Sequence, residues 1–447
     1  MRQNMERMTA GRSVRNGILA LALIGLAACN SQAISLGEAP YIYTEAGSYP
    51  AQDVPANQRT TRPQIYYVTD RAPQPTRKGG LGYGIERSSS MVFGASEVAY
   101  GSDLGWDGLV AASTQAGGSA DLALTVLQSR EIVRFSSTPL PFDVQNGRAV
   151  VLDQDRRDYE TQTRAFQAEI KAALRKSDRK EVMIFVHGFR NSFDDAQASL
   201  ASIWHYSGRI GVPVVYTWPA NNPGMFGYFK DRESGEFSIY HFKEFLRMLA
   251  EIPELEDINI IAHSRGTDVA TSALREMMIA ERAAGHIPRK SMKINNLILV
   301  APDLDFGVVR QRLIAERFGT AFGQITIYLN PRDGSLGLAQ TLMAGTRLGR
   351  ISFQDLGESE RESFRRIRNV NFIDVESVSR AREHSYFHNN PSVVSDIVLT
   401  LRTDARPGTT TRPLEQRDFN FWNLPKGYPF GRPKLVYPTD NRQETKD

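Results

Sequence analysis

Ser264 has the neighbours that nucleophilic catalysis requires. It lies in the pattern Ala262-x-Ser264-x-Gly266, between a short apolar run at 258–261 and a helical pattern at 267–284. Small residues two positions either side of a serine are typical of a nucleophile elbow, a sharp strand-to-helix turn where the two backbones nearly touch. The helix N-terminus would also present free N–H groups and a positive dipole end to an oxyanion. We therefore predict that Ser264 is a nucleophile.

A serine hydroxyl needs a base that takes its proton and a third group that holds the base. After an elbow of this type the acid and then the histidine follow along the chain. His286, His384 and His388 follow Ser264, and His286 precedes every candidate acid. His384 and His388 come after the last predicted strand, where a loop can return over the serine. We predict His384 as the base, with His388 as the alternative.

Two strand ends offer an acid. Asp333 follows the predicted strand 325–329, the penultimate one, whereas Asp303 and Asp305 follow the strand 297–300. The usual position of the acid is after the penultimate strand, which favours Asp333. Pro-Arg-Asp-Gly is by itself an ordinary turn sequence. Asp305 and Asp303 therefore stay open as alternatives.

The sequence His187-Gly188-Phe189 directly follows the predicted strand 182–186. A loop in this place commonly donates an N–H group to the oxyanion, and a second N–H comes from the residue after the nucleophile. We predict that the N–H groups of Phe189 and Arg265 form this oxyanion hole. Gly188 would let the backbone approach the substrate, and His187 is expected to hold the loop rather than to carry a proton.

A metal site is the competing interpretation of the two late histidines. His384 and His388 have the i, i+4 spacing that can bind zinc on a helix. Ser385 stands where a zinc protease would have glutamate, and Asn389-Asn390-Pro391 indicates a loop. We therefore expect neither a metal site nor a cofactor.

These residues need a scaffold that brings separate strand ends together. From residue 181 onward, apolar runs alternate with helical patterns, and the runs are apolar on both faces. Such an alternation predicts an α/β fold, a mostly parallel, doubly wound sheet with helices on both faces. Ligand sites in such sheets lie at the carboxyl ends of the strands. The predicted strands are 182–186, 212–218, 258–261, 297–300, 325–329 and 370–375, and the predicted helices are 156–176, 194–206, 236–250, 267–284, 308–318 and 393–401.

An ordered set of motifs across roughly residues 65–400 resembles a bacterial α/β-hydrolase family of uncharacterised function, whose members include lipoproteins and esterases. The motifs are Tyr67-Val68-Thr69-Asp70-Arg71, the stretch 185–196 around His187-Gly188-Phe189, Thr217-Trp218-Pro219-Ala220, the stretch 228–234, Ala262-His263-Ser264-Arg265-Gly266 and His384-Ser385-Tyr386-Phe387. The resemblance implies an α/β-hydrolase fold and supports Ser264, and His384 over His388. The family commonly has Met after the serine. Arg265 here implies an anionic substrate or, more simply, an ion pair with Asp268 or another neighbour.

The N-terminus predicts a membrane anchor. A basic segment at 1–15 precedes the apolar run 18–26, which is too short to span a bilayer. Leu26-Ala27-Ala28-Cys29 then resembles a bacterial lipoprotein signal, with lipid attached to Cys29, the single cysteine. Asn30 rather than Asp follows, which favours the outer membrane, facing the periplasm. We predict a signal peptide at 1–28, a flexible tether at 29–60, an α/β-hydrolase domain with an N-terminal strand-rich extension at 61–403, and a Pro/Arg-rich arm at 404–447.

The charge composition argues against one class of function, nucleic-acid binding. The formal net charge is only +4 over 447 residues, with Lys and Arg scattered, so nucleic-acid binding is not expected. The leading hypothesis is a serine hydrolase acting on a small-molecule or lipid ester at a membrane. The alternative is a lipid-anchored binding or scaffold protein without turnover. The stretch 222–234, rich in aromatic residues, is either a lid or pocket wall or ordinary loop packing.

Overall fold

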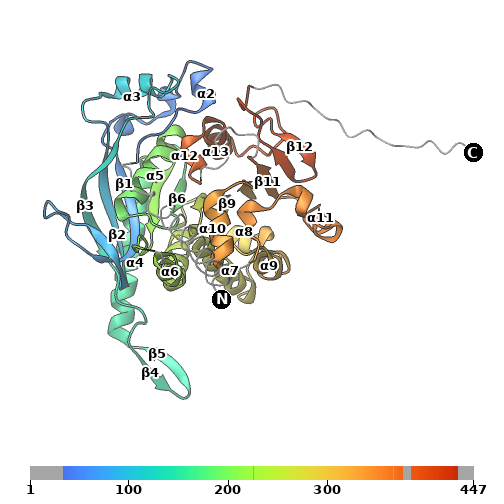
Figure 1. Ribbon diagram of the computed structural model, residues 1–447. Coiled ribbons are helices and arrows are strands. Elements are labelled where there is room, and N and C mark those ends of the chain that lie inside the picture. Colours follow the sequence, from blue (N-terminus) through green and yellow to red (C-terminus); the bar gives the residue numbers. More distant parts are fainter. Residues whose placement is uncertain (1–33, 225, 344, 366, 376–383, 431–447) are drawn as a thin grey trace, which may run out of the picture.

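The computed structural model describes residues 34–224, 226–343, 345–365, 367–375 and 384–430 (Figure 1). The predicted signal peptide at 1–28 and the predicted lipidation site Cys29 lie outside the described residues. So do residues 431–447 of the predicted C-terminal arm. Among the described helices, none combines the length and the apolar character that crossing a membrane requires.

An 11-stranded sheet forms the centre of the described molecule, with the strand order β12-β13-β11-β10-β9-β8-β6-β7-β1-β2-β3. From β13 to β1 every neighbouring pair is parallel. The antiparallel pairs lie at the two edges. The strands are β1 Gln64–Pro73, β2 Tyr83–Tyr100, β3 Leu124–Arg134, β6 Glu181–Val186, β7 Val212–Thr217, β8 Asp257–His263, β9 Ile294–Val300, β10 Gln324–Leu329, β11 Val370–Asp374, β12 Glu415–Asp418 and β13 Phe421–Asn423.

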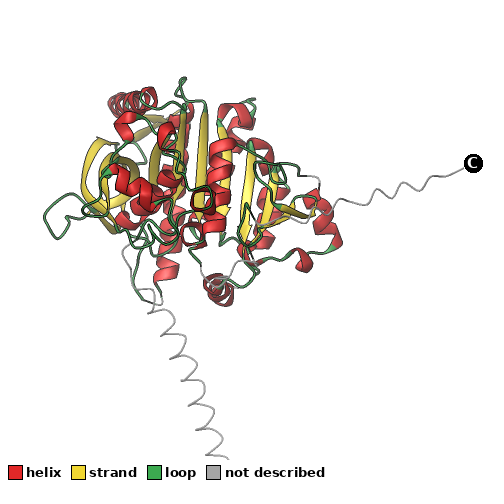
Figure 2. Ribbon diagram, turned by 90° about the horizontal axis from the view of Figure 1, so that it is seen from above, coloured by secondary structure: helices red, strands yellow, loops and turns green. Residues whose placement is uncertain are grey.

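The central strands are buried on both faces, as their continuous apolar sequences require. Every residue of β6, β7 and β10 is buried. One face packs against α4 Asp153–Arg175, α6 Gly227–Ala250 and α7 Gly266–Ala283. The other packs against α5 Phe193–Tyr206, α12 Tyr386–Asn389 and α13 Pro391–Thr403. Figure 2 shows helices on both sides of the strands. The predicted doubly wound α/β architecture is therefore confirmed.

Shorter elements connect these layers or extend from them. A two-stranded hairpin, β4 Phe142–Gln145 and β5 Arg148–Val151, projects from the body near the start of α4 (Figure 1). The predicted helix 308–318 is instead the single turn α9 Phe306–Val308 followed by a π-helix, η3 Val309–Ile314. The others are α2 Tyr41–Thr44, η1 Ala51–Asp53, η2 Ala56–Gln58, α3 Trp106–Ala112, α8 Pro288–Ser291, η4 Phe318–Ala321, α10 Gly334–Met343, η5 Leu348–Arg350, η6 Phe353–Asp355 and α11 Glu358–Arg365.

The prediction of a flexible tether does not hold for residues 34–60. Leu36, Tyr43 and Tyr49 of this segment are buried. The Tyr43 hydroxyl donates to the Tyr206 carbonyl at 2.6 Å, and the Tyr49 hydroxyl donates to the His205 carbonyl at 2.8 Å. The C-terminal end of α5 thus offers aromatic packing and carbonyl acceptors. The small and polar composition of the segment concealed these few anchoring side chains.

The described part of the predicted C-terminal arm, residues 404–430, completes one edge of the sheet. Strand β13 pairs in parallel with β11. Arg412 donates two hydrogen bonds to Asp396 of α13, at 2.8 and 2.7 Å, and both side chains are fully buried. The segment is therefore integrated into the domain. Its Pro/Arg-rich composition indicated an extended chain but not the carboxylate that would bind one of its arginines.

Candidate active site

Ser264 lies on a sharp turn between β8 and α7. Its φ is +52°, in the left-handed region that residues with a side chain seldom adopt. Gly266 opens α7, and a Cβ added there would overlap the His187 carbonyl oxygen, so no larger residue fits. Ala262, fully buried, is the small residue on the strand side. The predicted elbow geometry is thus present.

His384 links the serine to Asp333. Its Nε2 lies 2.7 Å from Ser264 Oγ, and its Nδ1 lies 2.7 Å from Asp333 Oδ2. An ionised carboxylate only accepts hydrogen bonds, so Nδ1 carries the proton and Nε2 faces the serine hydroxyl as an acceptor. The structure therefore brings together the three residues that the sequence nominated.

Asp333 is held rigidly beneath the histidine. It follows β10 and is fully buried. Its Oδ1 accepts from the Leu336 N–H at 3.0 Å, which leaves Oδ2 for His384. Burial disfavours the imidazolium of His384, but the charge and hydrogen bond of Asp333 outweigh it, and the pKa of His384 is raised above its ordinary 6.5. The carboxylate thus stabilises a protonated histidine.

The alternative acids have other partners. Asp303 is buried, accepts from the Tyr228 hydroxyl at 2.6 Å, and lies 3.4 Å from Arg347 Nε. Asp305 caps α9 by accepting from the Val308 N–H at 2.9 Å. Neither carboxylate forms a hydrogen bond with His384 in the described structure. Asp333 is therefore the acid that the geometry selects.

The alternative base lies elsewhere. His388 is in α12, and burial lowers its pKa to about 4. Its main chain packs against Gly37, where an added Cβ would lie close to the His388 carbonyl. His263, beside the serine, uses its Nε2 to contact the His384 carbonyl at 3.1 Å. Of these three histidines, only His384 contacts Ser264 Oγ.

The loop after β6 reaches the serine through Gly188. A Cβ added to Gly188 would lie 2.8 Å from Ser264 Cβ, so the glycine permits a backbone approach that other residues would block. Within the described part of the chain, no backbone hydrogen bond uses the N–H of Phe189 or of Arg265. In this part of the chain both predicted oxyanion donors therefore lack a backbone acceptor, as the predicted role requires.

The comparison with protein families agrees with this architecture. Residues 162–402, more than half of the chain, match the family described as alpha/beta hydrolase of unknown function (DUF900). The chain belongs to this α/β-hydrolase family. No curated protein matches the sequence. The resemblance and the fold class expected from the sequence are therefore confirmed.

The matched region carries every residue of the candidate site. Ser264, Asp333, His384, Phe189 and Arg265 all lie within residues 162–402 of this α/β-hydrolase family member. Strands β1 to β3 precede the matched region, and β12 and β13 follow it. The site is thus built on the part of the sheet that the family shares.

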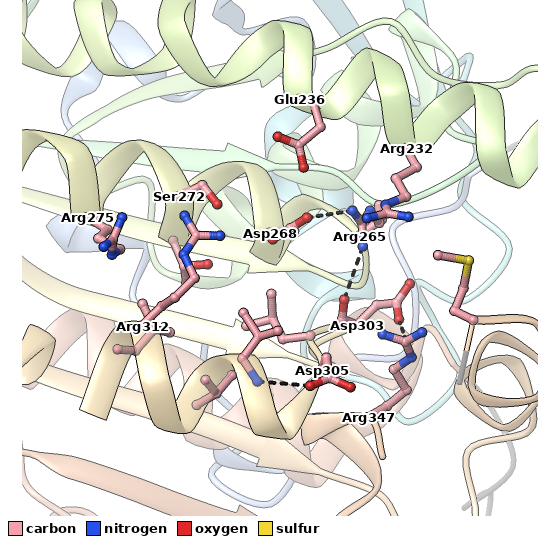
Figure 3. Close-up of a pocket in the computed structure, with 16 residues that line it drawn as sticks. Arg232, Glu236, Arg265, Asp268, Ser272, Arg275, Asp303, Asp305, Arg312 and Arg347 are labelled. Carbon is pink, nitrogen blue, oxygen red and sulfur yellow. Dashed lines mark hydrogen bonds and ion pairs between the residues drawn. The ribbon is translucent and has the colours of Figure 1, made fainter. Parts of the chain in front are cut away.

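The Arg265 side chain makes the ion pair that was the simpler expectation. It is buried, lies 2.5 Å from Asp268 Oδ2, and reaches the Asp303 carbonyl at 3.5 Å (Figure 3). It lines a polar cavity of about 320 Å³ together with Arg232, Glu236, Arg275, Arg312 and Arg347. Asp268, Asp303 and Asp305 also line this cavity, so arginine and carboxylate side chains are both present in its wall. The guanidinium beside the serine is therefore charge-compensated.

An apolar cavity of about 640 Å³ adjoins the polar one. The two share Val309 and Leu313 of η3. The larger cavity is also lined by Leu299, Ile327 and Phe372 from the strands. Arg265 lines the polar cavity, whereas none of the predicted site residues lines the apolar one.

The stretch 222–234 contains both buried and exposed aromatic side chains. It forms the start of α6, which begins about ten residues earlier than the sequence predicted. Tyr228 is buried, bonds Asp303, and packs edge-on against Phe189 with ring centroids 5.4 Å apart. Phe226 and Phe229 are exposed, at 67% and 38%. Tyr228 therefore supports the predicted oxyanion loop, while its neighbours face outward.

Three residues that position the loop were missed as such. Asp231 is fully buried and accepts from the Arg190 N–H at 3.3 Å and from the Asn221 N–H at 3.0 Å. Arg71 of β1 contacts the Asn191 carbonyl at 2.9 Å. The Trp218 backbone N–H donates to His187 Nε2 at 3.1 Å. Their only signal in the sequence was membership of the motifs that carry the family resemblance.

Proposed function

We propose that this α/β-hydrolase family member is a serine hydrolase that cleaves carboxylic esters through an acyl-enzyme intermediate. The observation that carries the proposal is the placement of His384 between Ser264 Oγ and Asp333, with 2.7 Å on each side. Such a chain activates a hydroxyl that would otherwise be a weak nucleophile. Membership of an α/β-hydrolase family supports hydrolysis in general.

The proposed reaction follows from the positions of these groups. Ser264 Oγ attacks the ester carbonyl carbon while His384 Nε2 takes the hydroxyl proton. Asp333 stabilises the imidazolium, and the N–H groups of Phe189 and Arg265 bind the oxyanion. The tetrahedral intermediate collapses, and the alcohol leaves with the proton from His384. Water, deprotonated by His384, then attacks the acyl-enzyme and releases the acid and free Ser264. This chemistry requires no cofactor.

Ester substrates, whether small molecules or lipids, fit the proposal better than amides. An alkoxide is a better leaving group than an amide nitrogen, so the two-step mechanism asks less of the site. The apolar cavity of about 640 Å³ has a size and lining ordinary for ligand pockets, but Ser264, Asp333 and His384 do not line it, so the proposed ester chemistry does not rest on it.

A fluorophosphonate probe tests the proposed nucleophile. The wild type should be labelled, Ser264→Ala should not, and hydrolysis of short p-nitrophenyl esters should be lost in His384→Ala. His388→Ala is the matched control and should keep the activity. Absence of both labelling and turnover in the folded wild type would favour a binding or scaffold protein instead. Labelling that persists in Ser264→Ala would assign the reactive hydroxyl elsewhere.

The proposed site of action is a bacterial outer membrane, facing the periplasm, with the chain held by lipid on Cys29. The support is the sequence Leu26-Ala27-Ala28-Cys29 after a basic segment and an apolar run. Expression with the native N-terminus and radiolabelled palmitate should label the wild type in the membrane fraction. Cys29→Ala should be unlabelled. Equal membrane recovery of an unlabelled wild type and the variant would contradict lipidation.

A further inference from the structure

The peptide between Gly188 and Phe189 is clamped from its carbonyl end. His187 Nδ1 lies 2.9 Å from the Gly188 carbonyl oxygen. The C=O and N–H of a trans peptide point in opposite directions. A bond that fixes the Gly188 carbonyl therefore also fixes the direction of the Phe189 N–H. This N–H is the proposed oxyanion donor, so its aim depends on the His187 ring.

The His187 ring is held in one tautomer. The Trp218 backbone N–H donates to Nε2 at 3.1 Å, and Arg71 Nη2 approaches the same nitrogen at 3.4 Å. Two donors at Nε2 require it to be unprotonated, so the proton is on Nδ1, which faces the Gly188 carbonyl. The ring also stacks on Trp218, with centroids 5.1 Å apart and planes 6° from parallel. Burial and the nearby Arg71 charge lower the pKa of His187 to about 3, which keeps the ring neutral.

Arg71 connects this histidine to the surrounding loops. It is 1% exposed, and in the described structure no carboxylate lies within ion-pair distance of its guanidinium. Its donors instead reach neutral acceptors on both sides of the oxyanion loop. These are Thr217 Oγ1 at 2.9 Å, the Gly84 carbonyl at 2.9 Å, the Ala220 carbonyl at 3.1 Å and the Asn191 carbonyl at 2.9 Å.

Burying a guanidinium without a directly paired carboxylate costs stability, and burial lowers the pKa of Arg71 to about 10. A plain structural crosslink could be made at lower cost by neutral side chains. The arrangement gains a planar fork whose donors fix two loops and one ring nitrogen simultaneously.

We propose that Arg71 is a positioning residue that, through His187, aims the Phe189 N–H at the oxyanion. The inference rests on the proposed function, because it assigns Arg71 to the transition state of that reaction. Arg71 precedes residues 162–402, so β1 contributes to the site from outside the segment that the family model matches. The contribution concerns the rate of the chemical step rather than ground-state binding of the ester.

Arg71→Lys tests this inference, because lysine keeps the charge but lacks the fork. Removing one oxyanion donor costs about 10²–10³-fold in kcat, so a misaimed donor should cost about 10–100-fold. KM should change less than about threefold, because the oxyanion exists only in the transition state. Affinity for a trifluoromethyl ketone, which forms a hemiketal oxyanion on serine, should fall in parallel with kcat/KM.

Arg209→Lys is the matched control. Arg209 is also fully buried and also donates to backbone carbonyls, those of Gln58 and Thr60, and it lies 3.4 Å from a histidine nitrogen, His205 Nδ1. It is remote from the oxyanion loop. Both variants should unfold at lower temperature, but only Arg71→Lys should lose kcat per folded molecule. Equal loss of kcat in the two variants, or wild-type kcat in folded Arg71→Lys, would overturn the inference.

Nitrogen NMR of the wild type separates this inference from the proposed function. Long-range ¹H–¹⁵N spectra, with His187 assigned through its contact with the Trp218 ring, should show a proton on Nδ1 and none on Nε2 from pH 5 to 8. A proton on Nε2 overturns the inference whether or not the protein hydrolyses esters. Failure of the proposed function appears separately, as an unlabelled and inactive wild type. A proton on Nε2 would overturn the inference even if Arg71→Lys does not fold.

Discussion

Asp333→Asn probes the proposed base directly. Asparagine has nearly the same shape as aspartate, and its oxygen can still accept from the Leu336 N–H, so the buried site should remain filled. Its NH₂ group would then face His384 Nδ1, which in the wild type lies 2.7 Å from a carboxylate oxygen of Asp333. Two donors cannot face each other, so the imidazole must move its proton to Nε2. That nitrogen faces Ser264 Oγ and could no longer accept the hydroxyl proton.

The size of the effect follows from the tautomer. Loss of the acid in serine hydrolases costs about 10⁴-fold in kcat when the geometry is kept, which corresponds to about 5 kcal/mol of transition-state stabilisation. The pH profile should change as well. A base must be neutral, so activity rises through the pKa of His384, which Asp333 raises above 6.5 against the effect of burial. Without the carboxylate, burial dominates, and the acidic limb should move to lower pH.

Hydrolysis of p-nitrophenyl butyrate between pH 5 and 9 measures both effects. The ratio of wild-type to variant kcat/KM should be largest above the wild-type pKa and should narrow at lower pH. Asp303→Asn is the control, because Asp303 is also buried but bonds Tyr228 rather than His384. The Asp303 charge contributes less than Asp333 to the raised pKa of His384, so the acidic limb of this variant should move less than that of Asp333→Asn. A folded Asp333→Asn within tenfold of the wild type, or with an unmoved limb, would refute the assignment.

Three further predictions concern stability. Gly266→Ala should lower the free energy of unfolding by about 1–3 kcal/mol in urea titrations, because the added Cβ meets the His187 carbonyl oxygen. Arg412→Met should cost about 3–5 kcal/mol in the same assay, because it leaves Asp396 buried without its cation. Burial raises the pKa of Glu181 to about 7, so native Glu181 holds a proton that the unfolded chain releases near pH 4.5. Stability should therefore fall as pH rises between these values, by at most about 3 kcal/mol, and Glu181→Gln should flatten this dependence.

The sequence alone was sufficient to nominate Ser264, Asp333 and His384 as one group. Parallel strands place their carboxyl ends at one edge of the sheet, so residues that follow different strands must meet there. Ser264 follows β8 and Asp333 follows β10, and chain order then required a histidine from beyond the last predicted strand. The choice of Asp333 over Asp303 also rested on strand order. Hydrophobic periodicity and the order of residues along the chain were therefore enough to predict these three residues without any knowledge of contacts.

Contacts between segments distant in sequence could not be predicted in this way. Arg71 and Asn191 lie 120 residues apart, and neither residue type announces the other. The same holds for Arg412 and Asp396, which attach the C-terminal segment to the sheet. A composition rich in Pro and Arg indicates extended backbone. It does not show whether one of the arginines pairs with a buried carboxylate elsewhere in the fold. The predictions of a flexible tether and of an extended arm were wrong for residues 34–60 and 404–430 for this reason.

The prediction of a helix at 308–318 was wrong for a different reason. Its apolar spacing fits an α-helix, but the structure has a single α-turn followed by a π-helix. A π-helix widens the turn to i→i+5 hydrogen bonds and shifts which side chains share a face. Val309 and Leu313, both in η3, line the polar and the apolar cavity.

The elbow and the oxyanion loop are parts of one packed contact. Gly266 leaves room for the His187 carbonyl, which in turn accepts from Trp218 Nε1 at 2.8 Å, while the ring of the same histidine holds the Gly188 carbonyl. His187 therefore has a structural role through its main chain and an orienting role through its side chain. Substitution of His187 would disturb both at once, and a loss of activity could not be assigned to either. Arg71 contacts the ring nitrogen of His187 and the far end of the loop, and its other donors reach Thr217, Gly84 and Ala220. None of these contacts is to the main chain of His187 or to Gly266, so replacing Arg71 separates the aim of the N–H from the packing of the elbow.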